Sequence, residues 1–285
     1  MELRGATVAV TGGGRGIGKA IARAAAREGA QVAVGDLDAD LALQTARELG
    51  PPAVGLALDV TDRASFATFL GSVTDALGPL DVLVNNAGIM HVGPFLEEDD
   101  SVTRTQVEVN LHGVLLGMKL ALPGMVSRGR GHVVNIASMA GKDGFPGGAT
   151  YCATKHAVIG ATDAVRGELA GSGVQVSAIM PSVVDTELAA GLGRSMIGVI
   201  PPEEVGRAVV RVLRTGSAEA YVPRAVGVLH ALFSPLPVAW RSAAAARLGA
   251  DRVLSGATLA RRAGYEARAR SSAPGARTAP DRDAG

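Results

Sequence analysis

The fold is decided by the stretch Thr7-Val8-Ala9-Val10-Thr11-Gly12-Gly13-Gly14-Arg15-Gly16-Ile17-Gly18. Its first four residues are an apolar run that predicts a buried strand, and a helical pattern of apolar residues starts at Ile17. A strand, a glycine-rich turn and a helix N-terminus form a pyrophosphate site, because the free amides and the helix dipole favour an anion. The glycines follow G-x-x-x-G-x-G, and no Gly-Lys-Ser/Thr ends the turn, so a Walker loop is not indicated.

A second apolar strand, Gln31 to Gly35, is followed by Asp36. An acid at this point is placed to accept from the adenosine ribose and repels a 2′-phosphate, which favours NAD over NADP. Arg15 argues the other way, since a basic residue in the turn could meet such a phosphate. We give Asp36 more weight, because a carboxylate beside a phosphate is unfavourable. Asp36 could also cap the helix that begins near Asp38.

The rest of the chain alternates strands with helices. Further strands are expected at Ala53 to Leu58, Asp81 to Val84, His132 to Ile136, Val174 to Met180 and, as a short seventh, Ala220 to Pro223. Helices are expected from Arg63 to Leu77 with Asp62 as N-cap, from about Ser101 to Ser127, and from about Tyr151 to Ala170. The alternation predicts an α/β fold, a Rossmann-like doubly wound parallel sheet of about seven strands with helices on both faces.

Polar residues follow several of these strands. Asp59, Asn85 to Gly88 and Ser138 come directly after predicted strands. In parallel sheets of this kind ligands bind at the carboxyl ends of the strands. We therefore expect these residues at the same edge as the glycine-rich turn.

Tyr151 and Lys155 are four residues apart on a predicted helix, so their side chains project from one face. A fixed ammonium favours the phenolate and lowers the pKa of a nearby tyrosine. Such a phenol could give or take a proton at an alcohol or carbonyl oxygen. The alternative is an amphipathic helix with a packed tyrosine and a solvated lysine.

Composition restricts the classes of partner. The net charge is +1, so the protein has no strong positive field to attract nucleic acid. Aromatic residues make up only 3% of the chain, so few side chains could stack on the bases of a single strand. The single cysteine, Cys152, excludes an internal disulfide and a multi-cysteine metal site, so we expect no metal. It also fits a reducing compartment. No leader sequence is indicated, and we expect a cytoplasmic protein.

Taken together, Thr11 to Gly18, Asn85 to Gly88, Ser138 and Tyr151-x-x-x-Lys155 resemble the short-chain dehydrogenase/reductase family, in its NAD(P)-dependent single-domain form. The resemblance implies an NAD-dependent oxidoreductase that transfers a hydride between nicotinamide and a secondary alcohol or ketone. NADP is the less favoured cofactor. An NAD-binding regulatory or scaffold protein without turnover is the alternative, since fold alone does not establish function.

The resemblance covers about Leu3 to Pro223 and implies individual roles. Ser138 would position the substrate oxygen, and Tyr151 would be the acid/base. Lys155 would bind the nicotinamide ribose and lower the pKa of Tyr151, and Asn110 matches an asparagine that holds a water in a proton relay through Lys155. The residues expected to contact the cofactor are Gly12, Arg15, Gly16, Ile17, Gly18, Asp36, Leu37, Asp59, Val60, Asn86, Ala87, Gly88, Tyr151, Lys155, Pro181, Val184 and Thr186.

The family pattern Pro-Gly-x-Val-x-Thr reads here as Pro181-Ser182-Val183-Val184-Asp185-Thr186. Val184 and Thr186 match positions that contact the nicotinamide carboxamide. Ser182 replaces the usual glycine, and it would be mildly strained if that position required a positive φ.

Substrate selection is expected from three loops: Met90 to Val92, Met139 to Thr150 and the lid-like Val183 to Pro202. The lid has few charges and no obvious clamp for a phosphate or carboxylate. Its apolar residues are Leu188, Leu192, Met196, Ile197, Val199 and Ile200. We therefore expect a hydrophobic alcohol or ketone, such as a sterol, a retinoid or an aliphatic compound. The alternative is that these residues only pack the lid onto the body.

From Arg224 the family pattern lapses. We expect a dehydrogenase domain over 1–224, an apolar and basic extension over 225–270 packed on it, and a disordered tail over 271–285. The extension would lie near the substrate mouth or on a partner subunit; a peripheral membrane contact is the other interpretation. Family habit suggests a homodimer or homotetramer.

Overall fold

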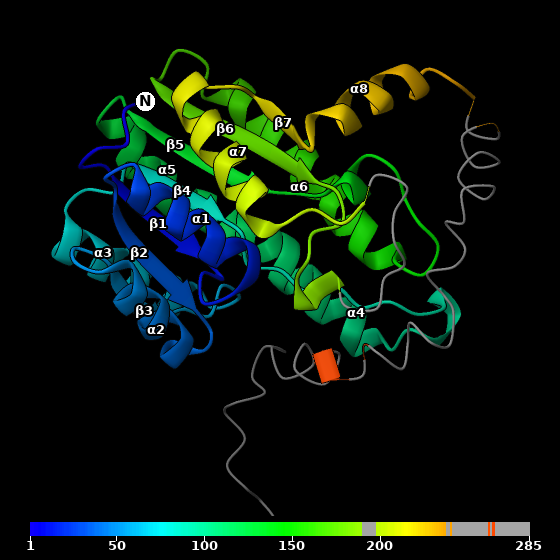
Figure 1. Cartoon of the computed structure of the whole chain (residues 1–285), viewed down its shortest axis with the longest axis horizontal. Coiled ribbons are helices and arrows are strands. Elements are labelled where there is room, and N and C mark those ends of the chain that lie inside the picture. The colour runs from blue at the N-terminus through cyan, green and yellow to red at the C-terminus, as the bar shows by residue number, and fades with distance from the viewer. Residues whose placement is uncertain (190–197, 238–239, 241–261, 263, 266–285) are drawn as a thin grey trace, which may run out of the picture.

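The computed structural model describes residues 1–189, 198–237, 240, 262 and 264–265. Seven strands form one sheet in the order β3-β2-β1-β4-β5-β6-β7 (Figure 1), and every neighbouring pair is parallel. The strands are β1 (Thr7–Thr11), β2 (Gln31–Asp36), β3 (Val54–Ala57), β4 (Val82–Asn85), β5 (Gly131–Ile136), β6 (Val174–Pro181) and β7 (Glu219–Val222). The predicted fold class is confirmed.

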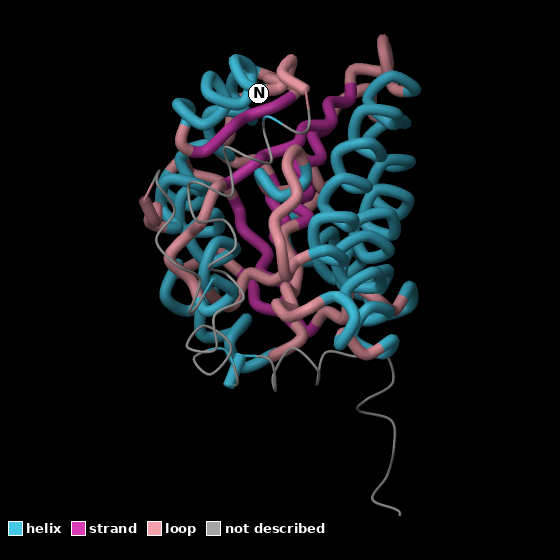
Figure 2. Tube along the Cα trace, turned by 90° about the vertical axis from the view of Figure 1, so that its right-hand side faces the viewer, coloured by secondary structure: helices cyan, strands magenta, loops and turns pink. Residues whose placement is uncertain are grey.

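Helices cover both faces of the sheet, as Figure 2 shows. One face carries α1 (Gly16–Arg27), α2 (Ala39–Leu49) and α7 (Pro202–Thr215), and the other carries α3 (Arg63–Leu77), α5 (Gly113–Ser127) and α6 (Ala149–Glu168). The sheet is buried on both sides, so its strands read as nearly continuous apolar runs.

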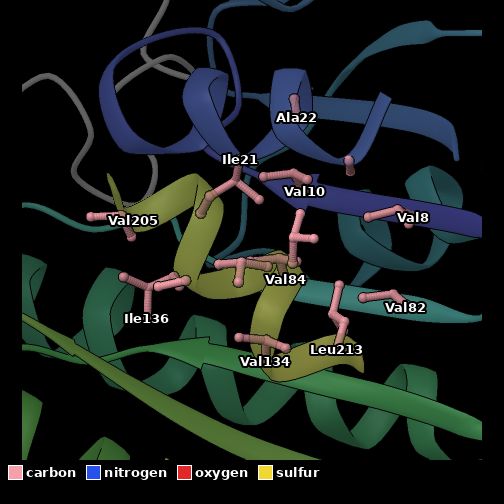
Figure 3. Packing of buried hydrophobic residues seen from close by; sticks show 14 of the residues in the cluster. Val8, Val10, Ile21, Ala22, Val82, Val84, Val134, Ile136, Val205 and Leu213 are labelled. Carbon is pink, nitrogen blue, oxygen red and sulfur yellow. The ribbon is translucent and has the colours of Figure 1, made fainter. Parts of the chain in front are cut away.

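The core on the α1 and α7 face is built mainly from β-branched side chains (Figure 3). Valines and an isoleucine of β1, β4 and β5 meet residues of the two helices; the labelled side chains are Val8, Val10, Val82, Val84, Val134, Ile136, Ile21, Ala22, Val205 and Leu213. Along β1, Val8 and Val10 point to this face and Ala9 to the other. This period of two fixes which residues of each strand face α1.

The long helix expected from Ser101 to Ser127 has three parts. These are α4 (Asp100–Val107), a π-helical segment η2 (Glu108–His112) and α5. A π turn inserts an extra residue into a helix, and such turns are frequent at functional sites. Among the described residues this helix alone is long and apolar enough to cross a membrane, but half of its most apolar window is buried in the fold.

Most predicted boundaries agree with the structure to within one or two residues. The Asp62 carboxylate accepts from the amide of Ala64 at 2.9 Å and caps α3, as expected. The helix with Tyr151 begins two residues earlier, at Ala149. Short 3-10 turns, η1 (Phe95–Glu97), η3 (Met139–Gly141) and η4 (Glu187–Ala189), lie in the loops at the carboxyl edge of the sheet.

After β7 the chain forms α8 (Arg224–Phe233), which is at the upper right of Figure 1. The expected disordered tail, most of the expected extension and the lid residues Leu192, Met196 and Ile197 lie outside the described residues. Arg262, Gly264 and Tyr265 are the described residues nearest the C-terminus.

Candidate active site

The glycine-rich turn after β1 is fixed to the end of β4. The Asn86 side-chain amide donates to the Thr11 and Gly12 carbonyl oxygens at 2.9 and 3.1 Å. The amides of Asn86 and Ala87 both donate to the Thr11 hydroxyl at 3.0 Å. Gly12 has φ +62°, and a Cβ on it would lie 2.9 Å from the Cα of Ala87. A Cβ on Gly18 would collide with the Gly12 carbonyl oxygen, so both positions require glycine.

Helix α1 presents its N-terminus at this turn. Arg15, its N-cap, has an extended backbone, and its own side chain does not cap the helix. The first backbone amides of a helix and the positive end of its dipole bind anions. The turn therefore fits the pyrophosphate of a dinucleotide. The Arg15 guanidinium pairs with the Glu187 carboxylate of η4 at 3.4 Å, on the lid side of the turn.

Asp36 holds the turn from its other side. Its carboxylate is buried and accepts from the amide of Gly14 at 2.9 Å and from the amide of Asp38 at 3.1 Å. Asp38 caps α2 by accepting from the amide of Leu41 at 3.2 Å. The capping role considered for Asp36 is therefore wrong, because Asp38 occupies that position. Leu37, between the two acids, is half-buried.

Asp59 and Val60 follow β3. One Asp59 carboxylate oxygen accepts from the amide and the hydroxyl of Thr61 at 2.9 and 2.7 Å, which closes a local turn. Val60 is buried, and a Cβ on Gly113 of α5 would lie 3.0 Å from it. Both residues lie at the carboxyl edge, and their contact with adenine stays a prediction.

The π-helical segment places Asn110 in the interior. Its side chain accepts from the amide of Ile89 and donates to the Ile89 carbonyl, both at 2.8 Å, and it donates to the Thr154 hydroxyl at 3.2 Å. A Cβ on Gly88 would lie 3.2 Å from the Asn110 side-chain oxygen and 3.6 Å from Lys155 Nζ. Asn110, Gly88 and Lys155 therefore meet at one point, as the motif positions imply.

Helix α6 brings Tyr151 and Lys155 to the same place. Lys155 Nζ donates to the Ile136 carbonyl oxygen at the end of β5 at 2.9 Å and lies 5.7 Å from the centre of the Tyr151 ring. Ser138, two residues after β5, is hydrogen-bonded to Tyr151, and its hydroxyl also accepts from the amide of Ala140 at 3.1 Å. The three predicted residues therefore form one cluster.

Burial dominates the protonation of this cluster. It raises the pKa of Tyr151 above the ordinary value, against a downward effect of the Ser138 hydrogen bond and with smaller upward effects of Tyr265 and Cys152. Burial also lowers the pKa of Lys155 to about 8. The expected lowering of the Tyr151 pKa by Lys155 is therefore not found in the chain alone, where burial is the main cause of the shift in both groups.

Beyond β6, Val184 is buried and bridges Ile200, and a Cβ on Gly16 would lie 3.3 Å from the Thr186 methyl group. Thr186 thus reaches the glycine-rich turn. None of the described non-glycine residues has a positive φ, so the strain considered for Ser182 is absent. The Ser182 hydroxyl oxygen is buried and has no hydrogen-bond partner among the described residues.

The substrate side is an apolar cluster around Tyr151. Its buried members are Met90, Val92, Ala140, Tyr151 and Cys152, with Phe145 and Leu188 packed against them. All three expected substrate loops contribute to it. Burial raises the pKa of the Cys152 thiol, which disfavours the thiolate and agrees with a packing role.

Two residues that the sequence did not point to also reach this cluster. Arg262 is fully buried and donates to the carbonyl oxygens of Leu188 and Met90. The Tyr265 hydroxyl accepts from the Met90 amide. They are more than 170 residues from Met90, and an arginine and a tyrosine in a basic segment carry no local signal of such a contact.

Comparison with known proteins agrees with this geometry. The short chain dehydrogenase family matches residues 6–196. Sorbitol dehydrogenase of Cereibacter sphaeroides is 42% identical over 66% of this chain and 73% of its own length. The 2-(S)-hydroxypropyl-CoM dehydrogenase 3 of Xanthobacter autotrophicus is 40% identical over 72% of this chain and 80% of its own length. A protein named inactive 2-(S)-hydroxypropyl-CoM dehydrogenase 2, from the same organism, is 42% identical over 62% and 76%.

The family match covers most of the chain. It agrees with the parallel sheet, with the turn that fits a pyrophosphate and with the cluster of serine, tyrosine and lysine. Members of this family act on small molecules with NAD or NADP. The chain belongs to the short-chain dehydrogenase family and is an oxidoreductase that acts on CH–OH groups.

Proposed function

We propose that the protein is an NAD-preferring dehydrogenase of a secondary alcohol that is apolar around its carbinol carbon, with Tyr151 as the acid/base. One observation carries the proposal. Ser138, Tyr151 and Lys155 form a single cluster, and the apolar side chains of Met90, Val92 and Leu188 are among those packed around Tyr151 on the substrate side. Such a site pairs a proton acceptor with an apolar surface for the rest of the substrate.

When bound, the cofactor would supply a hydride acceptor for the carbinol carbon. The Tyr151 side chain, as phenolate, would take the proton of the substrate hydroxyl, and Ser138 would donate a hydrogen bond to the same oxygen. A well-placed donor of this kind contributes about 3 kcal/mol in other enzymes. Because burial raises the pKa of Tyr151, the phenolate would depend on positive charge from Lys155 and from the bound oxidised cofactor.

Asn110 is the proposed positioning residue of the proton path. It binds both the amide and the carbonyl of Ile89, which fixes the backbone next to Gly88. Its side-chain oxygen faces the space above Gly88, which Lys155 Nζ also borders. A water held there would connect Lys155 to solvent. Asn110→Ala is therefore expected to lower the rate of proton release and to change the affinity for the cofactor less.

Two contacts support NAD as the preferred cofactor. The Asp36 carboxylate is held at the end of β2 by two amides, where it would oppose a 2′-phosphate. Arg15, the residue that could favour NADP, pairs instead with Glu187. Titration of the protein with each cofactor tests this. Tighter binding of NADP than of NAD would contradict the proposed preference. Asp36→Asn should reduce the difference in affinity between NAD and NADP.

The relative named for sorbitol favours a second substrate class, a polyol. The apolar residues Met90, Val92 and Leu188 support a hydrophobic alcohol instead. The experiment is to mix protein and NAD with octan-2-ol, cyclohexanol or sorbitol and follow the absorbance of the reduced cofactor. A higher kcat/KM for sorbitol than for both apolar alcohols would favour the polyol.

The relative named as inactive supports an alternative function, that of a cofactor-binding protein without turnover. Against it, this chain has the serine, tyrosine, lysine and asparagine of the family, and the structure brings them together. The same assay separates the two functions. Binding of NAD without oxidation of any alcohol in the panel would favour the scaffold.

We also propose a cytoplasmic homodimer or homotetramer that uses the helix Asp100–Ser127 and α6. Val107 and Val126 on that helix are exposed, which supports a further contact. The alternative partner is a membrane surface, which the exposed Leu232 of α8 and Trp240 would suit. Sedimentation velocity gives the oligomeric state, and co-sedimentation with anionic phospholipid vesicles tests the membrane contact.

A further inference from the structure

We infer that Arg262 and Tyr265 are part of the substrate site: Arg262 clamps the C-terminal segment to two substrate loops, and Tyr265 limits the size of the alcohol. The inference rests on the proposed function, because it names the residues that restrict that same site. It concerns the part of the chain beyond residue 196, where the family match ends.

Arg262 connects two walls of the apolar cluster. Its side chain is fully buried, and its two terminal nitrogens donate to the Leu188 carbonyl at 2.8 Å and to the Met90 carbonyl at 2.6 Å. Leu188 is in η4, and Met90 is in the loop after β4. The planar guanidinium presents several donors in a fixed geometry, so one residue can hold both backbones.

Tyr265 completes the contact with Met90. Its hydroxyl accepts from the Met90 amide at 2.9 Å, and its ring faces the Arg262 guanidinium at 4.9 Å. The amide and the carbonyl of Met90 are therefore both held by C-terminal residues. Met90 itself packs in the cluster with Tyr151. The segment thus grips a loop that lines the reacting group.

The position of Tyr265 relative to Tyr151 assigns it a function in specificity. The Tyr265 hydroxyl binds the amide of Met90, and Met90 packs in the same cluster as Tyr151, so the Tyr265 side chain borders the substrate side of that cluster. A substituent of the substrate next to its carbinol carbon has to share that space with the Tyr265 ring. A bulky ring at this point limits the length of alcohol that fits.

A buried cation makes the clamp sensitive to substitution. A guanidinium taken out of water is stabilised by well-placed acceptors, and the Leu188 and Met90 carbonyls are among those of Arg262. Arg262→Met keeps an apolar side chain of similar length but removes both hydrogen bonds. The loops with Met90 and Leu188 then lose their common anchor, and substrate is bound less tightly.

The test compares variants of the full chain by steady-state kinetics with NAD and either butan-2-ol or octan-2-ol. Tyr265→Ala should raise the kcat/KM ratio of octan-2-ol to butan-2-ol about 10-fold, the scale of discrimination in an apolar pocket. Arg262→Met should raise KM for both alcohols about 10-fold, with kcat and the Kd for NAD within about 2-fold. Trp240→Ala, an exposed residue of the same part of the chain, is the matched control and should change nothing.

An unchanged alcohol ratio in Tyr265→Ala, or a parallel loss of kcat and of NAD binding in Arg262→Met, would overturn the inference in favour of a purely structural role. Tyr265→Phe keeps the ring on Arg262 and removes only the hydroxyl, so it separates folding from function. It should leave the alcohol ratio within about 2-fold and raise KM by less than Arg262→Met.

A failure of the proposed function is recognised separately, since the wild-type chain would then oxidise no alcohol. In that case hydrogen exchange decides the contact. The Met90 amide should exchange faster in Tyr265→Phe and Arg262→Met than in the wild type or Trp240→Ala. Equal exchange in all four proteins would exclude the clamp.

Discussion

Two ionisable side chains are buried at opposite edges of the sheet, and they differ in what surrounds them. Lys155 is at the carboxyl edge, where it binds the Ile136 carbonyl beside Tyr151. His132 is at the amino end of β5, where its ring contacts the Ser177 hydroxyl at 2.8 Å. Burial lowers the pKa of both, to about 8 for Lys155 and about 4 for His132.

The difference shows that a shifted pKa does not by itself mark a catalytic site. Around Lys155 there are a phenol, a serine hydroxyl and the glycine Gly88, whereas around His132 the Ser177 hydroxyl only donates onward to the Ser217 carbonyl. Buried charges are costly at both edges. Only near Lys155, at the carboxyl edge, do the neighbouring groups include a phenol and a hydroxyl that could use a nearby charge in proton transfer.

The largest effect is expected for Tyr151→Phe, which keeps the ring and removes the hydroxyl that we propose as the acid/base. General acid–base groups contribute 10²- to 10⁴-fold, so kcat/KM should fall about 10³-fold, or about 4 kcal/mol. NAD binding should stay within about 2-fold. The measurement is alcohol oxidation with NAD, with Tyr221→Phe as control. Equal turnover of wild type and Tyr151→Phe would remove the distinction between the two edges.

Lys155→Met should lower kcat/KM by about 10²-fold and yet stabilise the fold. The folded-state pKa of Lys155 is about 8 against 10.5 ordinarily, so the unfolded chain binds more protons between these values. The stability of the wild type therefore rises with pH across that window, and below pH 8 the full penalty of about 3 kcal/mol is present. Urea unfolding at pH 7 measures the gain.

The matched control is Lys119→Met on the exposed side of α5, which should change neither activity nor stability. A loss of stability in Lys155→Met at pH 7 would contradict the proposal that the buried charge of Lys155 destabilises the folded protein.

His132 should govern acid stability without affecting catalysis. Its pKa is about 4 in the folded chain against 6.5 ordinarily, so the unfolded chain binds more protons between these values. The stability contribution is complete above pH 6.5 and is lost as pH falls toward 4, by about 3 kcal/mol. His132→Gln should flatten this slope in thermal unfolding and keep kcat within about 2-fold at pH 7.5.

His112→Gln serves as control, because this exposed histidine lies in a helical ion pair with Glu108. A slope that persists in His132→Gln would assign the acid sensitivity elsewhere.

The smallest effect is expected between the two edges. Asn135 of β5 accepts from the Asn85 amide and donates to the Thr162 hydroxyl of α6, both at 2.9 Å. Thr162→Val removes the oxygen acceptor of the Asn135 side-chain nitrogen, leaves only the weaker Met118 sulfur at 3.4 Å, and should cost about 1–2 kcal/mol of unfolding free energy. Thr74→Val on the exposed side of α3 is the control. If Thr162→Val lowered the unfolding free energy by more than the effects expected at Lys155 and His132, the polar contacts inside the sheet would matter more for stability than those at its two ends.

The sequence predicted those features that depend on neighbouring residues. Apolar runs placed all seven strands, and the Asp62 cap was found from its position before an apolar helix. Tyr151 and Lys155 were found because helical spacing alone brings them to one face. The meeting of Ser138 with them followed from parallel topology, which puts all carboxyl ends at one edge.

The features that were missed depend on tertiary packing. The π turn around Asn110 has no local sequence signal, since Glu108 to His112 reads as ordinary helix. The raised pKa of Tyr151 follows from how completely the site is closed, which spacing does not report. The approach of Arg262 and Tyr265 to Met90 joins parts of the chain that no local pattern connects.

The π turn has a consequence for tolerance to insertions and deletions. Removal of the extra residue between Glu108 and His112 would restore regular α-helical hydrogen bonding and leave α4 and α5 in nearly the same relative orientation, whereas loss of a residue within α4 itself would rotate its apolar stripe by about 100° relative to α5. Without the wide turn, the Asn110 side chain would lose its position at Ile89. A single deletion is therefore absorbed at the π turn at the cost of the Asn110 contact, but it is not absorbed elsewhere in this helix.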